Sequence, residues 1–254
     1  MGDHYVHVKV DNAIAWLTLT EPARLNPVTM ARIATITRTA RELSERDDVR
    51  VIVVTGAGRG FCSGADLTDD GLRNIAHYPP ASGTFLDAQR VWTLTSVRQP
   101  VVAMVNGAAV GFGFELALQA DIRIAGESAK FGFPYAQMGG VTDTGAATWL
   151  MPRLIGSARA AEILFTGGFL TAAEAADIGL VNRVVPDDQL RAVTLELCQR
   201  IVAGVPAAVQ ALKTMLVLGQ HQTAAEHALL QYDYMNKYRP DLDDFTKKRV
   251  KKPS

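Results

Sequence analysis

The stretch from Thr55 to Leu67, TGAGRGFCSGADL, follows the apolar run VRVIVV and is rich in glycine. A strand that feeds a glycine-rich turn is typical of the phosphate loop of dinucleotide-binding folds. That loop needs a third glycine at its sixth position and a helix directly after it, so that the helix N-terminus meets the pyrophosphate. Here the sixth position is Phe61, and the segment CSGADLTDDG that follows does not begin a helix. We therefore interpret the stretch as a loop whose glycines let a ligand approach the backbone closely.

A second segment repeats this arrangement further along the chain. In NGAAVGFGFE, Asn106 to Glu115, an apolar strand again feeds a glycine turn and then the start of a helix. Two such turns can aim two backbone N–H groups at one point, which is how a developing oxyanion is stabilised. Spacing alone leaves a second interpretation open, in which both are tight turns without chemistry.

The composition limits the partners that the protein can have. Its 254 residues include 26 Lys and Arg against 26 Asp and Glu, so the net charge is zero and no overall field attracts polyanions. We therefore expect no nucleic-acid partner. A hydrophobic share of 48% is typical of a globular protein of enzyme size.

The cysteines, histidines and apolar segments indicate the compartment of the protein and whether it binds a membrane or a metal. Cys62 and Cys198 are the only cysteines and lie far apart, which suits a reducing compartment. The start MGDHYVHVKV has no secretory signal, so we expect a cytoplasmic protein. The most membrane-like segment, Val101 to Ala120, carries Glu115 well inside it, which predicts buried core and no membrane span. No pair of histidines has metal-ligand spacing, so we expect no metal site.

Local patterns in the first part of the chain predict an α/β fold. The start YVHVKVDNAIAWLTLTEP reads as two strands around a turn at Asp11 and Asn12. Helical spacing of apolar residues predicts a helix capped near Thr29. Arg50 to Thr55 is a continuous β-branched run, hence a strand buried on both faces. Strand, helix, strand is how an α/β arrangement begins.

Helical patterns dominate the later part of the chain. We expect a helix around Phe85 to Ser96, and Thr171 and Glu174 have the spacing of a capping box. Pro206 opens another helix, and the pattern stays helical to Arg239. We place a boundary near residue 195, which divides a core domain, 1–195, from a helical C-terminal region, 196–254.

Several long motifs in order resemble the crotonase superfamily, the enoyl-CoA hydratases and isomerases. TGAGRGFCSGADL is similar to the first oxyanion segment of that family, and Ala103 to Ala125, AMVNGAAVGFGFELALQADIRIA, to the second. Phe131 to Val185 resembles the segment that lines the acyl pocket, and Leu17 to Met30, LTLTEPARLNPVTM, the N-terminal signature. The match runs from about residue 5 to residue 195.

The resemblance implies a fold and a ligand. The fold would be a crotonase-like spiral of ββα units with a C-terminal helical region that packs trimers, so a homotrimer or a dimer of trimers is expected. The bound molecule would be an acyl-coenzyme A thioester. Coenzyme A would then be part of the substrate, with no separate cofactor.

The resemblance also places the oxyanion donors. They fall on the backbone N–H groups of Ala65 and Phe112, beside Gly64 and Gly111. The family usually has glycine where this chain has Phe112. Because the donor is main chain, Phe112 can keep the function if its ring points away from the thioester. One such donor is typically worth about 3 to 4 kcal/mol of barrier.

The carboxylates of this sequence depart from the pattern of the family. Ordinary hydratases of this family use two glutamates around a water molecule. The first falls on Glu115, and the second falls where this sequence has Tyr135. Asp143 matches a position where some superfamily members carry a catalytic or nucleophilic acid. Structural alternatives are a turn aspartate at Asp143 and a helix-start glutamate at Glu115.

These residues permit several activities. The leading hypothesis is hydration of an enoyl-CoA, with Glu115 deprotonating the attacking water and Asp143, or water held by Tyr135, protonating the α-carbon. The runner-up is double-bond isomerisation, with Asp143 moving one proton and Glu115 in support. A third is hydrolysis or dehalogenation by carboxylate attack. A hypothesis of another class is a protein that binds CoA esters without turnover.

The resemblance finally suggests contacts for the coenzyme and the acyl chain. Coenzyme contacts would come from Ala23, Arg24, Leu25, Asp66, Leu67, Phe245 and Lys248. The last two lie in the cationic tail DDFTKKRVKKPS, which could equally be a solvated end. The acyl pocket could be shaped by Phe85, Trp92, Tyr135, Trp149 and Phe165, although such aromatic residues are more often plain core.

Overall fold

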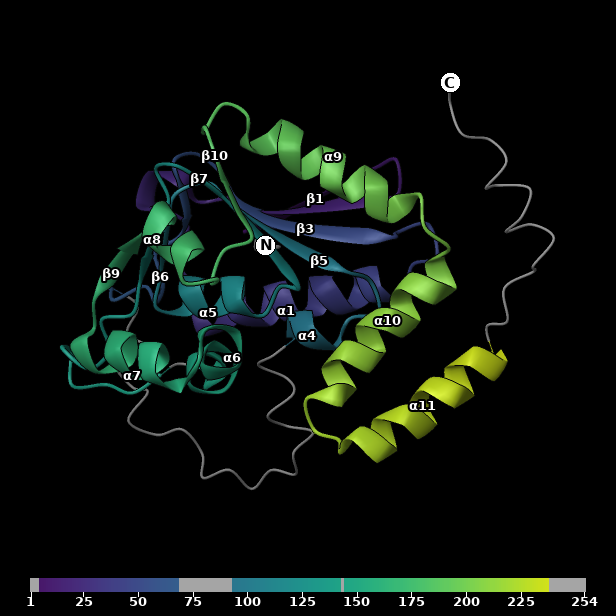
Figure 1. Cartoon of the computed structure of the whole chain (residues 1–254). Helices are drawn as coiled ribbons and strands as arrows, with labels where there is room; N and C mark the ends of the chain where they lie inside the picture. The colour runs from purple at the N-terminus through teal and green to yellow at the C-terminus, as the bar shows by residue number, and fades with distance from the viewer. Residues whose placement is uncertain (1–4, 69–92, 143, 238–254) are drawn as a thin grey trace. The chain divides into compact units, whose positions relative to one another are not determined.

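A computed structural model describes residues 5–68, 93–142 and 144–237 of the chain (Figure 1). The chain divides into two compact units, residues 1–203 and residues 204–254. The sequence placed this boundary near residue 195, which lies inside helix α9 (Leu190–Val202). Of the helix expected around Phe85 to Ser96, only α4 (Thr93–Ser96) falls within the described residues.

The first unit contains a six-stranded sheet in the order β1-β2-β3-β5-β7-β10. The first two strands pair antiparallel, and the following pairs are parallel. The strands are β1 (Val6–Asp11), β2 (Ile14–Leu19), β3 (Val51–Gly56), β5 (Val101–Val105), β7 (Ile122–Gly126) and β10 (Arg183–Val185).

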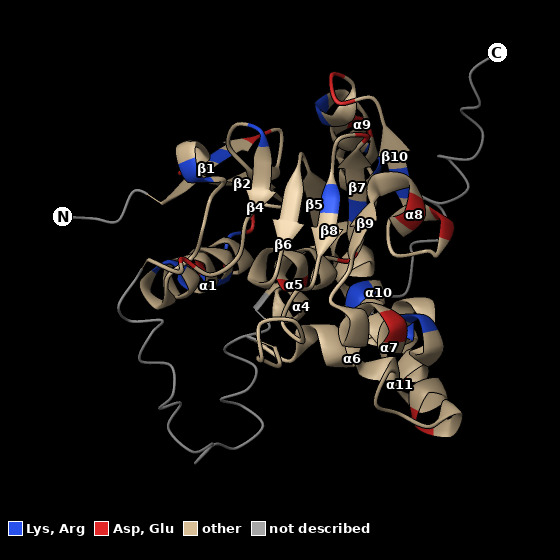
Figure 2. Ribbon diagram, turned by 90° about the vertical axis from the view of Figure 1, so that its left-hand side faces the viewer, with Lys and Arg blue, Asp and Glu red and all other residues tan. Residues whose placement is uncertain are grey.

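A smaller sheet has the order β4-β6-β8-β9, and its strands lie side by side in Figure 2. Its strands are β4 (Gly60–Cys62), β6 (Ala108–Val110), β8 (Lys130–Gly132) and β9 (Phe169–Thr171). The remaining helical elements of this unit are η1 (Pro22–Arg24), α1 (Met30–Ser44), α5 (Phe112–Leu118), α6 (Ala146–Ile155), α7 (Ser157–Thr166) and α8 (Ala172–Asp177).

Chain order explains how the two sheets are built. From β5 onward the chain adds one strand to the large sheet, one strand to the small sheet and then a helix: β5, β6, α5, followed by β7, β8, α6. This is the repeated ββα unit expected for the crotonase-like spiral.

Local signals in the sequence agree closely with the structure, although the first hairpin turn lies at Asn12 and Ala13, one residue later than predicted. Asn12 and Ala13 adopt positive φ values of 49° and 63°, the backbone that a tight hairpin turn between β1 and β2 requires. Thr29 caps α1, because its side chain accepts a hydrogen bond from the N–H of Arg32 at 3.2 Å. Thr171 and Glu174 form the predicted capping box of α8.

Strand β3, in the middle of the large sheet, is buried on both faces. All six residues of β3 are buried, and alternate residues face different clusters. Ile52 and Val54 belong to the main core, whereas Val51 and Val53 pack in a second cluster with Leu190 of α9. In Figure 1, α9 lies along one face of this sheet and α1 and α5 along the other. Burial on both faces agrees with the continuous apolar run of the sequence.

The second unit consists, in its described part, of α10 (Pro206–Gly219) and α11 (Ala224–Lys237). Pro206 begins α10 as predicted, and the helical pattern is interrupted by a turn at residues 220–223. Among the described residues, no single helix is long and apolar enough to cross a membrane. Only α9 and α10 taken together reach the required length and apolar composition.

Candidate active site

The first glycine turn presents one backbone N–H that has no acceptor among the described residues. Val28 and Ala65 form an isolated parallel bridge, in which the N–H of Val28 donates to Gly64 O at 2.8 Å and the N–H of Asp66 donates to Val28 O at 2.8 Å. The N–H of Ala65 lies between these two bonds and donates to no acceptor in the described part of the chain. The resemblance to the crotonase superfamily implies that this group is the first oxyanion donor.

The second turn presents a matching group at the start of α5. Gly111 O accepts the helical hydrogen bond of the Glu115 N–H at 3.0 Å, and the N–H of Gly111 donates to Gly132 O at 3.0 Å. The N–H of Phe112 again has no acceptor among the described residues. The Phe112 side chain is 2% exposed and packs in the main core. The ring therefore points into the core and does not cover the Phe112 N–H.

The two turns touch each other. A Cβ atom placed on Gly64 would lie 2.7 Å from Val110 O and 3.6 Å from the Cα of Gly111. Gly64 also has a φ of +89°, a conformation that glycine adopts without strain. The absence of a side chain at Gly64 therefore brings the two free N–H groups into one region of the molecule.

Two asparagines hold the glycine loop that precedes Ala65, and sequence reasoning missed both. The Asn26 side chain is completely buried and donates to Gly60 O at 2.9 Å and to Ala57 O at 3.0 Å. Asn106 donates to Gly56 O at 2.9 Å and to Gly58 O at 2.8 Å. Buried carbonyl groups need such partners, so these amides fix the shape of the loop. The only signal in the sequence was the presence of Asn26 in LTLTEPARLNPVTM and of Asn106 in NGAAVGFGFE.

Glu115 is fully buried and bound by the segment after β8. Its carboxylate accepts hydrogen bonds from the Thr142 hydroxyl, from the Thr144 N–H at 2.9 Å and hydroxyl at 2.8 Å, and from the Ala147 N–H at 3.0 Å. A carboxylate has about four lone-pair sites, and these four donors match that capacity. The carboxylate thus ties the start of α5 to the turn before α6.

Tyr135 lies beside the second turn. A Cβ atom on Gly111 would lie 3.1 Å from the Tyr135 hydroxyl oxygen, and the Tyr135 ring packs on Phe133 with centroids 4.6 Å apart. The structure therefore brings together four of the predicted site positions: Gly64, Ala65, Gly111 and Phe112, with Tyr135 at their edge.

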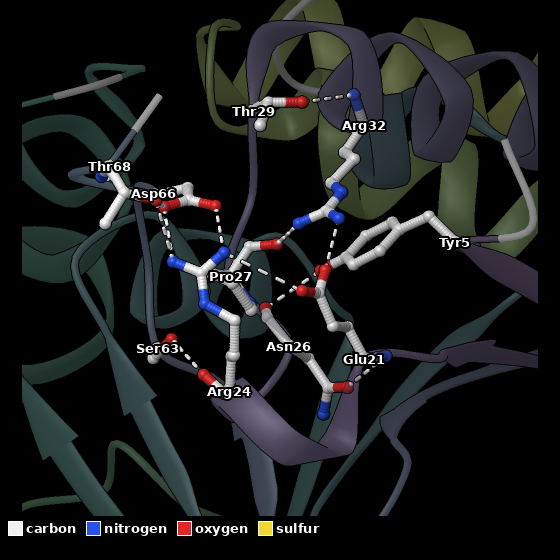
Figure 3. Close-up of polar contacts among 10 residues, drawn as sticks. All are labelled: Tyr5, Glu21, Arg24, Asn26, Pro27, Thr29, Arg32, Ser63, Asp66 and Thr68. Carbon is white, nitrogen blue, oxygen red and sulfur yellow. Dashed lines mark hydrogen bonds and ion pairs between the residues drawn. The ribbon is translucent and has the colours of Figure 1, made fainter. Parts of the chain in front are cut away.

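Two of the predicted coenzyme contacts, Arg24 and Asp66, belong to a charged cluster around the first turn (Figure 3). Arg24 makes a bidentate pair with Asp66, with both N–O distances at 2.6 Å. The bonds from Arg24 and Thr68 hold the pKa of the Asp66 carboxyl well below its usual range, although burial opposes this shift. Ala23 and Leu67 are exposed, and Leu25 is half-buried with a left-handed φ of 62°.

The remaining predicted residues either lie outside the described residues or are characterised only by their burial. Trp92, Asp143, Phe245, Lys248 and Phe85 belong to the undescribed parts. Phe165 is 79% exposed and so is not plain core, whereas Trp149 is partly buried with Arg153 stacked on its ring. Within the described ranges, no group of three metal-ligating side chains is present.

Comparison with known proteins identifies the family that this fold and these turns define. The sequence profile of the enoyl-CoA hydratase/isomerase family matches residues 9–250. The chain belongs to this family, within the crotonase superfamily, whose members act on acyl-CoA thioesters.

Individual relatives carry the names of both activities. The 1,2-epoxyphenylacetyl-CoA isomerase of Escherichia coli K12 is 32% identical over 251 residues, which cover 94% of each chain. The crystal structure of an enoyl-CoA hydratase from Bacillus anthracis superposes with a TM-score of 0.88 at 28% identity, covering 98% of this chain and 97% of that one. A monofunctional enoyl CoA isomerase from M. smegmatis superposes with a TM-score of 0.75 at 33% identity, covering 89% and 99%.

Proposed function

We propose that the protein moves the carbon–carbon double bond of an enoyl-CoA thioester through an enolate bound by the N–H groups of Ala65 and Phe112. Removing a proton from the α-carbon, next to the thioester carbonyl, places negative charge on the carbonyl oxygen. Two preorganised donors at that oxygen lower the barrier, and return of the proton to another carbon completes the shift. No water is consumed, so a single acid–base group is sufficient.

The hydrogen bonding of Glu115 is the observation that carries this choice of reaction. Hydration needs a base whose lone pair faces the attacking water. Both oxygens of Glu115 already accept bonds from Thr142, Thr144 and Ala147. We therefore assign Glu115 a positioning role, which differs from the leading hypothesis of the sequence and agrees with its runner-up.

Tyr135 supports the same choice. It occupies the position at which the family's second glutamate would fall, and its hydroxyl lies against Gly111. A phenol offers a hydrogen-bond donor there, but not the second carboxylate of a two-glutamate hydration. The acid that remains for proton transfer is Asp143, which lies outside the described residues. Its two sequence neighbours, Thr142 and Thr144, both donate to Glu115.

Hydration is the second candidate. It is supported by a glutamate at the family's first catalytic position, Glu115, and by relatives that are named hydratases, among them the structure with a TM-score of 0.88. Hydrolysis, dehalogenation and binding without turnover have no observation of their own in the described residues.

The deciding experiment gives the purified protein a non-conjugated and a conjugated enoyl-CoA. Gain of thioester conjugation reports isomerisation, loss of conjugation with uptake of water reports hydration, and deuterium incorporation from heavy water reports proton transfer at carbon. Asp143→Asn should lower isomerisation by about 10²- to 10⁴-fold, the usual contribution of general acid–base catalysis. Glu162→Gln, an exposed glutamate of α7, is the matched control. Hydration by the wild type that Glu115→Gln abolishes and Asp143→Asn spares would overturn the proposal.

A further inference from the structure

The residues on both sides of Ala65 are tied to one segment, residues 24–28. Before Ala65, the Ser63 N–H donates to Leu25 O at 2.9 Å and the Ser63 hydroxyl donates to Arg24 O at 3.2 Å. After it, the Asp66 N–H donates to Val28 O. The turn therefore cannot rotate without breaking bonds to a segment that is distant in sequence.

The bond from Val28 to Gly64 sets the direction of the Ala65 N–H. The carbonyl of Gly64 and the N–H of Ala65 belong to one planar peptide group, and in a trans peptide they point in opposite directions. Because the Val28 N–H holds the Gly64 carbonyl at 2.8 Å, the Ala65 N–H must face away from Val28. A carbonyl that accepts a hydrogen bond also polarises its amide, which makes the N–H a stronger donor.

The side chain of Asp66 locks this arrangement from the other end. Asp66 directly follows Ala65, and its carboxylate accepts two bonds from Arg24, one from the Thr68 hydroxyl at 2.6 Å and one from the Thr68 N–H at 3.0 Å. We infer that the Arg24–Asp66 ion pair is a positioning clamp for the Ala65 N–H, an inference that rests on the proposed oxyanion role of Ala65.

The charges around the clamp argue for positioning over phosphate binding. Arg24 uses both terminal nitrogens on Asp66 and also lies 3.7 Å from Glu21, while Glu21 forms a close ion pair with Arg32. Figure 3 shows these four side chains around the turn. Two cations and two anions sum to zero, so the cluster offers no excess charge to the phosphates of a coenzyme. Arg24 and Asp66 thereby receive a different role from the coenzyme contact that the family resemblance implies.

Steady-state kinetics separate the two roles. Arg24→Gln and Asp66→Asn would each be assayed with an enoyl-CoA and with the corresponding N-acetylcysteamine thioester, which lacks the phosphates. A clamp predicts that kcat falls about tenfold with both substrates, because a displaced donor stabilises the enolate poorly. A coenzyme ligand predicts a higher KM for the CoA ester alone, at unchanged kcat, and this result would overturn the clamp.

Arg46→Gln is the matched control for the ion pair. Arg46 forms a bidentate pair with Asp48, with N–O distances of 2.8 and 2.6 Å, on the connection between α1 and β3. This variant should retain both kinetic constants. If it lowers kcat as much as Arg24→Gln does, loss of any such pair is sufficient and the clamp is wrong.

Binding of acetoacetyl-CoA tests the clamp without turnover. The near-ultraviolet absorbance of its enolate reports how strongly the bound carbonyl oxygen is stabilised. Wild type should raise the enolate fraction at fixed pH, Arg24→Gln and Asp66→Asn should raise it several-fold less, and Arg46→Gln should match wild type. An equal rise in all four proteins rejects the clamp and leaves the proposed function intact. No rise in the wild type rejects the oxyanion role itself, and with it both proposals.

Discussion

The two turns that present free N–H groups are held in different ways. The Ala65 turn is fixed by bonds to residues 24–28 and by the ion pair of Asp66 with Arg24, whose side chain is 44% exposed. In the other turn, Phe112 is the first residue of α5, and all seven residues of that helix are buried. One donor is thus aimed by side chains at the surface and the other by the core. It follows that substitution of the ion pair of Arg24 and Asp66 can separate activity from stability, whereas substitutions around Phe112 cannot.

The largest effect is expected for Glu115→Ala. It removes the acceptor of four hydrogen bonds in a fully buried site and leaves the N–H groups of Thr144 and Ala147 without their partner. Bonds to charged groups contribute about 1.5 to 3 kcal/mol each, though not additively, so the free energy of unfolding should fall by about 4 kcal/mol. Urea unfolding measures the change, with Glu162→Ala as control. A loss below about 1 kcal/mol would show that the core does not depend on this carboxylate, and the contrast between the turns would disappear.

Gly64→Ala should affect activity and stability together. Its Cβ would lie 2.7 Å from Val110 O, and its φ of +89° strains any L-residue. We expect about 3 kcal/mol of destabilisation and a kcat about 100-fold lower, because the two turns are pushed apart.

Gly179→Ala is the control for this substitution. Gly179 has a similar φ of +82°, but nothing lies within 4 Å of its added Cβ. It measures the cost of the backbone conformation alone, about 1 to 2 kcal/mol, without loss of kcat. If the two variants behave alike, contact between the turns is not what places the donors.

A smaller effect is expected for Asn106→Ala. Asn106 follows β5 and holds carbonyl groups of the loop that precedes the other turn, so it connects the two regions. Loss of its amide should cost about 1 to 2 kcal/mol, because the loop carbonyls are partly accessible to water. Thermal unfolding and kcat would be compared with those of Asn182→Ala, an exposed asparagine with one backbone bond. An unchanged kcat at lowered stability would mean that the loop anchor is separate from the donor geometry.

The sequence predicted the fold well wherever the signal was local. The hairpin turn, found at Asn12 and Ala13, the cap at Thr29 and the capping box at Thr171 each depend on residues that are close together in sequence. The β-branched run of β3 also predicted burial on both faces, because side chains of such a run cannot all face one core. Ala65 and Phe112 were identified as candidate donors by the resemblance of their glycine motifs to those of the crotonase superfamily, since spacing alone left plain tight turns open.

The supporting contacts of the site could not be predicted in the same way. Arg24 and Asp66 are 42 residues apart, Asn26 and Gly60 are 34 apart, and Glu115 and Thr144 are 29 apart. Pairings of this kind depend on how the ββα units stack, and no pattern within a short window encodes them. For the same reason the sequence left Glu115 as a candidate base, since its four donors become visible only in the fold.

The smallest effect is expected in the pH dependence of stability, and it tests how the Ala65 turn is held. Hydrogen bonds from Arg24, then from Thr68, lower the pKa of the Asp66 carboxyl in the folded protein. A group with a depressed folded pKa contributes stability above its unfolded value, about 3.9, and loses that contribution as the pH falls through the folded pKa. The difference in unfolding free energy between wild type and Asp66→Asn should therefore be constant from about pH 5 to pH 8 and shrink below about pH 4. Urea unfolding at several pH values measures this difference. A change centred near neutral pH would mean that another group controls the clamp, and the Ala65 turn would then respond to pH in the range where the enzyme is assayed.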